Sequence, residues 1–148
     1  MDQICLVVPI LPGRTADAKD FRRELESGRN ADYQRSEQRI GIVKEAWYLA
    51  RTPACDQLVA YLESPDCPAA LSKFSQSQDQ FDQWFKQRLA DATGLDLNTP
   101  PTAPLPELLS SYPANGRHSP NRTHVQQSGH ARRSAAHDRS RAHNTRTT

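Results

Sequence analysis

The segment GIVKEAWYL, residues 41–49, places a carboxylate among apolar residues. Side chains alternate between the two faces of a β-strand, so Glu45 would share one face with Trp47 and Leu49. A carboxylate without a partner on such a face has a raised pKa and can act as a general base. Alternatively, a cation holds it in a structural ion pair, because buried charges are usually paired, and Arg88 is the candidate cation. The segment therefore predicts a Glu45 that is either catalytic or structural.

Aromatic side chains from several predicted elements could line a cleft for a flat apolar ligand. These side chains are Trp47, Tyr61, Phe74, Phe81, Trp84 and Phe85. Packing in the hydrophobic core is the alternative, because a body of this size needs several large side chains. The candidate ligand-binding residues are Trp47, Tyr61, Trp84, Phe85 and Arg88.

Several other chemistries lack the residues that they need. All five histidines lie after residue 113, so the preceding body has no Ser-His-Asp or Cys-His arrangement and no histidine ligand for a metal or haem. The sequence contains neither a G-x-G-x-x-G nor a Walker motif for nucleotide cofactors. We therefore expect no metal and no cofactor, and an enzyme would have to work with Glu, Asp, Arg, Tyr or Cys.

Three cysteines, Cys5, Cys55 and Cys67, show no C-x-x-C spacing. Their odd number indicates reduced thiols of a cytoplasmic protein rather than disulfides or zinc ligands. Cys5 lies in an apolar run and is expected in the core. No stretch approaches the roughly 18 apolar residues of a membrane span, and the N-terminus lacks the basic region of a signal peptide. The cytoplasm is the expected location.

The spacing of apolar residues predicts the elements that would carry these side chains. The predicted order is a strand within 3–11, a helix at 15–40 broken near Gly28, strands at 41–49 and 57–63 joined by a hairpin at 51–56, and helices at 64–74 and 75–94. The first strand is continuously apolar, so both of its faces should be covered. After the break in the first helix, Tyr33, Glu37 and Ile40 fall on one side.

Local signals mark the ends of the last two helices. Ser64 or Asp66 can cap the first of the two. Ser77 and Gln80 match a capping box for the second, and Gly94 is its C-terminal stop. Only residues 94–97 could supply a final strand.

The chain is predicted to have three parts: an α+β domain at 1–97, a proline-rich arm at 98–113 and a tail at 114–148. The arm contains five prolines and several leucines, which predicts an extended segment packed on this subunit or on a neighbour. Residues 1–112 carry a net charge of −4, whereas residues 113–148 carry +6. The two segments therefore differ in composition as well as in charge.

The tail at 114–148 has Val125 as its one large aliphatic residue and no aromatic residue, which predicts a disordered Arg/His-rich segment. Its histidines are six or seven residues apart, wider than usual zinc-ligand spacing. Its arginines suggest nucleic acid, but it lacks aromatic side chains to stack on bases, so nucleic acid is not favoured as a partner. An out-of-frame extension is an alternative that the sequence leaves open.

The order of elements, the GI-x-K-E strand and the FDQWF helix resemble uncharacterised bacterial proteins of the dimeric α/β barrel (ferredoxin-like) superfamily, over residues 3–112. Distant relatives there are antibiotic-biosynthesis-monooxygenase-like. The expected fold is α+β, a ferredoxin-like split βαββα(β) unit with an antiparallel sheet. The resemblance implies a homodimer, with a ligand cleft between sheet and helices.

These observations lead to two functional hypotheses. In one, the chain binds a small apolar or aromatic molecule in that cleft, as a cofactor-independent monooxygenase or isomerase. In the other, it is a non-catalytic dimeric binding or assembly module. A cleft that contains Glu45 and a second polar group favours the first hypothesis, and a solid aromatic core with Glu45 held by Arg88 favours the second.

Overall fold

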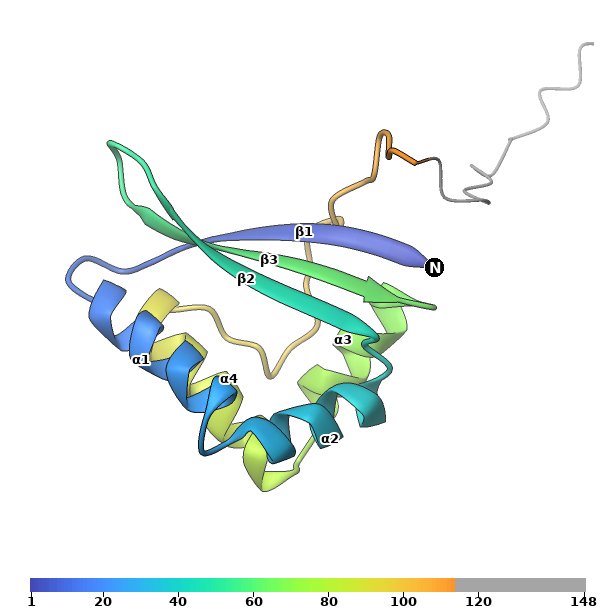
Figure 1. The fold of residues 1–148 in the computed structure, drawn as a ribbon, viewed down its shortest axis with the longest axis horizontal. Helices are drawn as coiled ribbons and strands as arrows, with labels where there is room; N and C mark the ends of the chain where they lie inside the picture. The colour runs from blue at the N-terminus through green and yellow to red at the C-terminus, as the bar shows by residue number, and fades with distance from the viewer. Residues whose placement is uncertain (114–148) are drawn as a thin grey trace, which may run out of the picture. The chain divides into compact units, whose positions relative to one another are not determined.

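A computed structural model describes residues 1–113 and shows the α+β class expected from the sequence. Three strands form one antiparallel sheet: β1 (Asp2–Pro9), β2 (Lys44–Arg51) and β3 (Asp56–Ser64). Four helices accompany it: α1 (Thr15–Glu26), α2 (Asn30–Ile40), α3 (Cys67–Gln76) and α4 (Gln80–Thr93). The compact unit is Met1–Tyr112 (Figure 1). The predictions for residues 114–148 lie outside the described residues.

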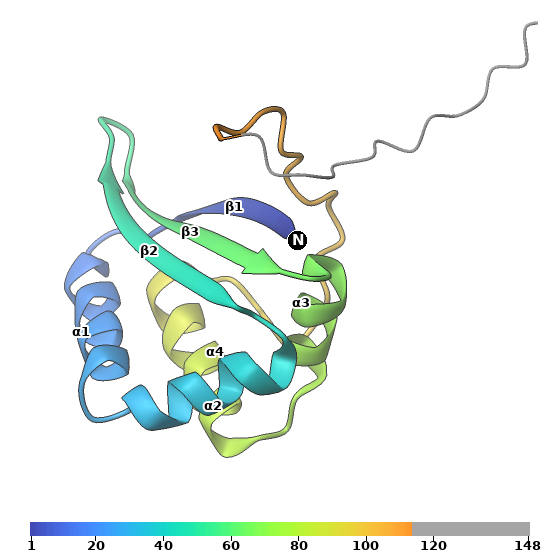
Figure 2. The same ribbon diagram turned by 45° about the vertical axis from the view of Figure 1, so that its right-hand side comes forward.

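The strand order is β1-β3-β2, and β3 pairs antiparallel with both neighbours. All four helices lie against the same face of this sheet (Figures 1 and 2). That face is apolar because alternate strand residues such as Leu58, Ala60 and Leu62 point toward the helices and are buried. The result is a two-layer body with its core between the sheet and the helices.

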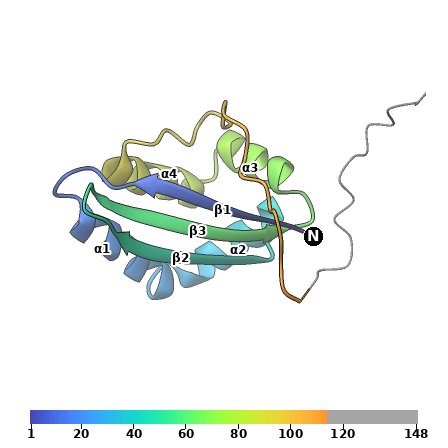
Figure 3. The ribbon, with the colours of Figure 1, turned by 90° about the horizontal axis from the view of Figure 1, so that it is seen from above.

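The opposite face of the sheet has no helix over it within residues 1–113 (Figure 3). Cys5 and Val7 lie there, and Val7 is 56% exposed. The prediction that Cys5 belongs to the core is therefore wrong for this chain, since strand alternation turns it away from the buried Ile4. The continuous apolar run of β1 thus leaves apolar side chains on an open face.

The predicted break near Gly28 is confirmed, because α1 ends at Glu26 and α2 begins at Asn30. The cap of α3 is Asp66, whose Oδ1 accepts a hydrogen bond of 2.8 Å from the backbone N–H of Ala69. The predicted capping box of α4 is wrong. Asp79 caps that helix instead, while the Ser77 hydroxyl donates to the carboxylate of Asp82.

Residues 94–97, the one segment that could supply a final strand, are coil. Gly94 has a φ of 74° and ends α4 in the left-handed conformation. Asp96 Oδ1 then accepts a hydrogen bond of 2.9 Å from the backbone N–H of Asn98, a local turn that competes with an extended strand. Leu97 packs against the core instead of continuing a sheet.

The first half of the arm lies against α3. Pro100, Pro101 and Leu105 face Pro68 and Leu71 across a shallow groove. The second half points outward, with Leu109 and Tyr112 almost fully exposed. The arm therefore packs on its own subunit over its first half.

A buried polar cluster ties α2 to α4 and to the turn before α4. Asp82 is completely buried and accepts hydrogen bonds from the hydroxyls of Ser36 and Ser77, and one of 2.7 Å from Arg39 Nη2. Lys86 Nζ donates to the backbone carbonyls of Ser75 and Ser77, at 2.9 Å each. These contacts satisfy both buried charges and fix the spacing of the two helices.

Within residues 1–113, no helix is both long enough and apolar enough to cross a membrane.

Candidate functional site

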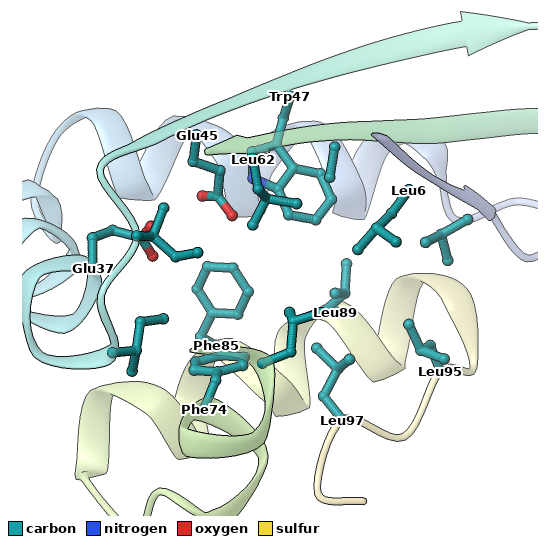
Figure 4. A pocket seen from close by; sticks show the side chains of 15 residues that line it. Leu6, Glu37, Glu45, Trp47, Leu62, Phe74, Phe85, Leu89, Leu95 and Leu97 are labelled. Atoms are coloured by element: carbon teal, nitrogen blue, oxygen red, sulfur yellow. The ribbon is translucent and has the colours of Figure 1, made fainter. Parts of the chain in front are cut away.

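A cavity of about 70 Å³ lies in the core between the sheet and the helices (Figure 4). Apolar side chains make most of its wall: Leu6, Val8, Ile40, Ile42, Trp47, Ala60, Leu62, Leu71, Phe74, Phe85, Leu89, Leu95 and Leu97. Two carboxylates complete it, Glu45 from β2 and Glu37 from α2. Figure 4 shows both carboxylates on the same side of the cavity. The site is therefore an apolar space with acidic groups at one end.

Glu45 points from β2 toward the helices, beside Trp47, and its side chain is 7% exposed. Its Oε2 accepts a hydrogen bond from the hydroxyl of Tyr33 on α2 and lies 3.7 Å from Nη2 of Arg22 on α1. Burial raises the pKa of Glu45, and the positive charge of Arg22 opposes that rise. Glu45 is thus buried, as the alternation predicts, and it is held by two partners.

Arg22 carries its charge among aromatic rings. Its Cζ lies 4.3 Å from the ring centroid of Trp47, 5.1 Å from that of Phe21 and 5.7 Å from that of Phe85. Such cation–π contacts favour a guanidinium that has lost part of its hydration. Burial lowers the pKa of Arg22 to about 10, so the group stays positively charged at neutral pH. Arg22 therefore supplies the counter-charge of Glu45.

The prediction that Arg88 pairs with Glu45 is wrong. Arg88 Nη2 donates instead to Oε1 of Glu24, at 2.7 Å, in a half-exposed pair that joins α4 to α1. Arg22 comes one residue after Phe21 and four after Ala18, both on the buried side of α1. That position on the edge of the apolar stripe was the signal that could have identified it.

Glu37 is the residue that sequence reasoning missed. Its Oε2 is buried and has no hydrogen-bond partner within the described part of the chain. Burial raises the pKa of Glu37 to about 7, although Arg22 partly opposes this. The signal was its position between Tyr33 and Ile40 on one side of α2, the side that faces the cavity. The site thus contains two acidic groups, one with partners and one without.

The other predicted site residues divide between the cavity and more distant places. Trp47 and Phe85 line the cavity with Glu45. Trp84 packs between α-helices, with its ring 4.4 Å from Cζ of Arg29. Tyr61 lies on the open face of the sheet, where its hydroxyl donates to Oε1 of Glu63 at 2.7 Å.

A shallower groove of about 290 Å³ runs outside the cavity, between α2 and β2. It shares Glu37, Ile42 and Glu45 with the cavity, and Gln34 and Lys44 give it a polar rim. The two carboxylates consequently stand between a solvent-facing groove and an apolar interior. Such a position suits a group that exchanges protons with water and also meets a buried ligand.

Comparison of the chain with protein-family models, curated proteins and solved structures found no match. The geometry of the cavity and its two carboxylates is therefore the guide to function.

Proposed function

We propose that this protein binds a small apolar or aromatic molecule where the cavity meets the outer groove, and acts on it by proton transfer without a cofactor, in the manner of an isomerase. The supporting observation is that two buried carboxylates with raised pKa values line an otherwise apolar space. A base whose pKa lies near the working pH is well suited to take a proton and return it elsewhere on the ligand. The arrangement also fits the cleft implied by the superfamily resemblance.

Ligand binding can be tested by thermal shift and calorimetric titration with benzene, toluene, phenol and indole. Ala60 lies on the cavity wall, so Ala60→Leu should fill part of the space and weaken or abolish binding. Ala46 is its neighbour on β2 but has the opposite side-chain direction, so Ala46→Leu is a matched control that should bind as the parent does. Absence of binding by every compound, or equal binding by the Ala60→Leu variant, would contradict this function.

We further propose that the body is a ferredoxin-like unit that forms a homodimer through the open face of its sheet. The antiparallel order β1-β3-β2 agrees with a split βαβ unit that lacks its last strand. Val7 and Tyr48 are more than half exposed on the open face, and an apolar patch of this kind is typical of a protein interface.

Light scattering tests the dimer, which should have twice the 16.6 kDa mass of the chain at micromolar concentration. Val7→Lys should give the monomer mass, because it places a charge on the open face. Val43 is equally exposed, at 58%, but lies outside β2 beside the groove, so Val43→Lys is the matched control and should remain dimeric. A monomeric parent protein would refute the dimer.

The open face also supports a second candidate function, a non-catalytic dimeric assembly module. The pairing of Glu45 with Arg22 and Tyr33 agrees with a structural role for that carboxylate. A stable dimer that binds none of the test compounds would favour this function over the first.

A further inference from the structure

The two carboxylates of the cavity differ in how their oxygen atoms are satisfied. Glu45 Oε2 has the Tyr33 hydroxyl and the Arg22 guanidinium beside it. Glu37 Oε2 is also buried but has no donor within residues 1–113. Buried acceptors in folded proteins are almost always hydrogen-bonded, to protein or to water, so Oε2 of Glu37 is an acceptor that a donor on a bound molecule can pair.

Other unpaired polar atoms gather around the same place. Trp47 Nε1 and Arg22 Nη1 are also buried without a hydrogen-bond partner among the described residues. The indole N–H of Trp47 is near enough to Glu45 to lower its pKa, but not at hydrogen-bonding geometry. Both atoms are hydrogen-bond donors, so a donor on a ligand would not pair with them. Oε2 of Glu37 is an acceptor, so a donor on a ligand can pair with it.

The position of Glu37 suits contact with a bound molecule. It lines both the apolar cavity and the outer groove, and Figure 4 shows its carboxylate beside that of Glu45, on the cavity side of α2. Phe85 and Leu62 border the same space and offer only carbon atoms to a ligand. A ligand that packs its ring against these side chains would present its polar group to the acidic end of the cavity.

We propose that the ligand is a small aromatic molecule with a hydroxyl hydrogen-bond donor, a phenol in its simplest form, and that this hydroxyl donates to Oε2 of Glu37. This inference rests on the proposed function, since it names the chemistry of the molecule in the cavity. Glu45 is held by Arg22 and Tyr33 at the same end of the cavity, and Glu37 is the residue that distinguishes a hydroxylated ring from a plain one. Phenol has an O–H group that can donate a hydrogen bond to Glu37, whereas its methyl ether, anisole, has none.

The pH dependence of binding follows from the state of Glu37. Burial raises the pKa of Glu37 to about 7, while the positive charge of Arg22 opposes this rise and the negative charge of Asp82 adds to it. The carboxylate is therefore ionised at pH 8.5 and protonated at pH 5.5. Hydrogen bonds to an ionised acceptor are about twice as strong as neutral ones. Phenol itself stays neutral across this range, because phenolic hydroxyls have a pKa of about 10. The preference for phenol over anisole should therefore grow as the pH rises through 7.

The test is a calorimetric or NMR titration of the full chain with phenol and with anisole at pH 5.5 and 8.5. We expect the parent to prefer phenol by about tenfold at pH 8.5 and by a few-fold at pH 5.5. Glu37→Gln keeps the shape but cannot ionise, so its preference should be small and independent of pH. Glu107→Gln changes an exposed carboxylate on the arm and should behave as the parent.

The outcomes separate this inference from the proposed function. Equal binding of phenol and anisole by the parent at both pH values would overturn the role of Glu37 and leave binding in the cavity intact. A pH-dependent preference that persists in Glu37→Gln would also overturn it, because another group would then accept the hydroxyl. Failure of both compounds to bind, together with the other apolar probes, would overturn the proposed function itself.

Discussion

Replacing Glu37 with Gln should stabilise the protein at alkaline pH and have little effect at acidic pH. The carboxylate of Glu37 is buried beside Ile40 and Ile42 in a mostly apolar wall, and its Oε2 has no hydrogen-bond partner among residues 1–113. Folding therefore removes a charge from water without replacing its hydration. Gln has nearly the same shape and no charge, so it relieves this penalty wherever the parent residue is ionised.

The size of the effect follows from the pKa of Glu37, which burial raises from 4.5 to about 7. A pKa difference of this size corresponds to about 3 kcal/mol of free energy between the two protonation states. Because the folded-state pKa is the higher one, the contribution of Glu37 to stability is most favourable below pH 4.5 and becomes less favourable as the pH rises toward 7. Relative to the parent, Glu37→Gln should therefore gain roughly 2–3 kcal/mol between pH 5 and pH 8.

Equilibrium unfolding in urea at pH 5 and pH 8 measures this gain, with the free energy of unfolding of parent and variant compared at each pH. Glu107→Gln serves as the control, because Glu107 is exposed on the arm and its substitution should give the same small difference at both values. If the difference between Glu37→Gln and the parent were the same at pH 5 and pH 8, within about 0.5 kcal/mol, the burial argument for Glu37 would be refuted.

Three further substitutions test the contacts around the cavity. Glu45→Gln leaves Arg22 without its counter-charge and should lower the free energy of unfolding by about 3 kcal/mol at neutral pH; an unchanged urea midpoint would show that the pair is not structural. Tyr33→Phe removes the hydroxyl that donates to Glu45 and should cost about 1–2 kcal/mol, while raising the pKa of Glu45 in an NMR titration; a lower pKa would contradict the hydrogen bond. Asp82→Asn should cost about 3 kcal/mol at pH 7. Burial raises the pKa of Asp82, but its hydrogen bonds outweigh this effect and hold that pKa below the ordinary value. The cost of Asp82→Asn should therefore shrink as the pH falls below the ordinary pKa of an aspartate and the parent carboxylate becomes protonated. A cost that does not change with pH would argue against an ionised Asp82.

Much of the fold can be predicted from the alternation of apolar residues along strands and from their spacing along helices. The strand around Glu45, the hairpin to β3 and the break near Gly28 each depend on neighbours in the sequence, and each is found in the structure. The same local reasoning placed Glu45 on the inner face with Trp47. Local patterns succeed here because burial on one face of a strand or helix leaves a period in the sequence.

The errors concern contacts between elements that are distant in the sequence. Arg22 and Arg88 both lie on partly apolar helical stripes, and only the packing of α1 over β2 decides which one reaches Glu45. The sequence pattern indicates that Glu37 is an ordinary polar residue on a half-exposed helix, because the packing of α2 against the sheet, which buries Glu37, is not part of that local pattern. The missing strand at 94–97 has a local cause, since the side chain of Asp96 bonds to the chain two residues on.

The polar cluster around Asp82 makes one wall of the cavity, formed by α2 and α4, more rigid than the wall formed by the coil at 94–97. Asp82 and Arg39 join α4 to α2 through charge-assisted hydrogen bonds, so the helices that carry Phe85 and Glu37 cannot move apart without breaking a half-buried ion pair. The coil at 94–97 is joined to the core by leucine side chains and short turns instead. Segments with few buried hydrogen bonds open at lower free energy than packed helices. Molecules should therefore enter and leave past this coil, and amide hydrogen exchange should be faster at residues 94–97 than along α2 or α4.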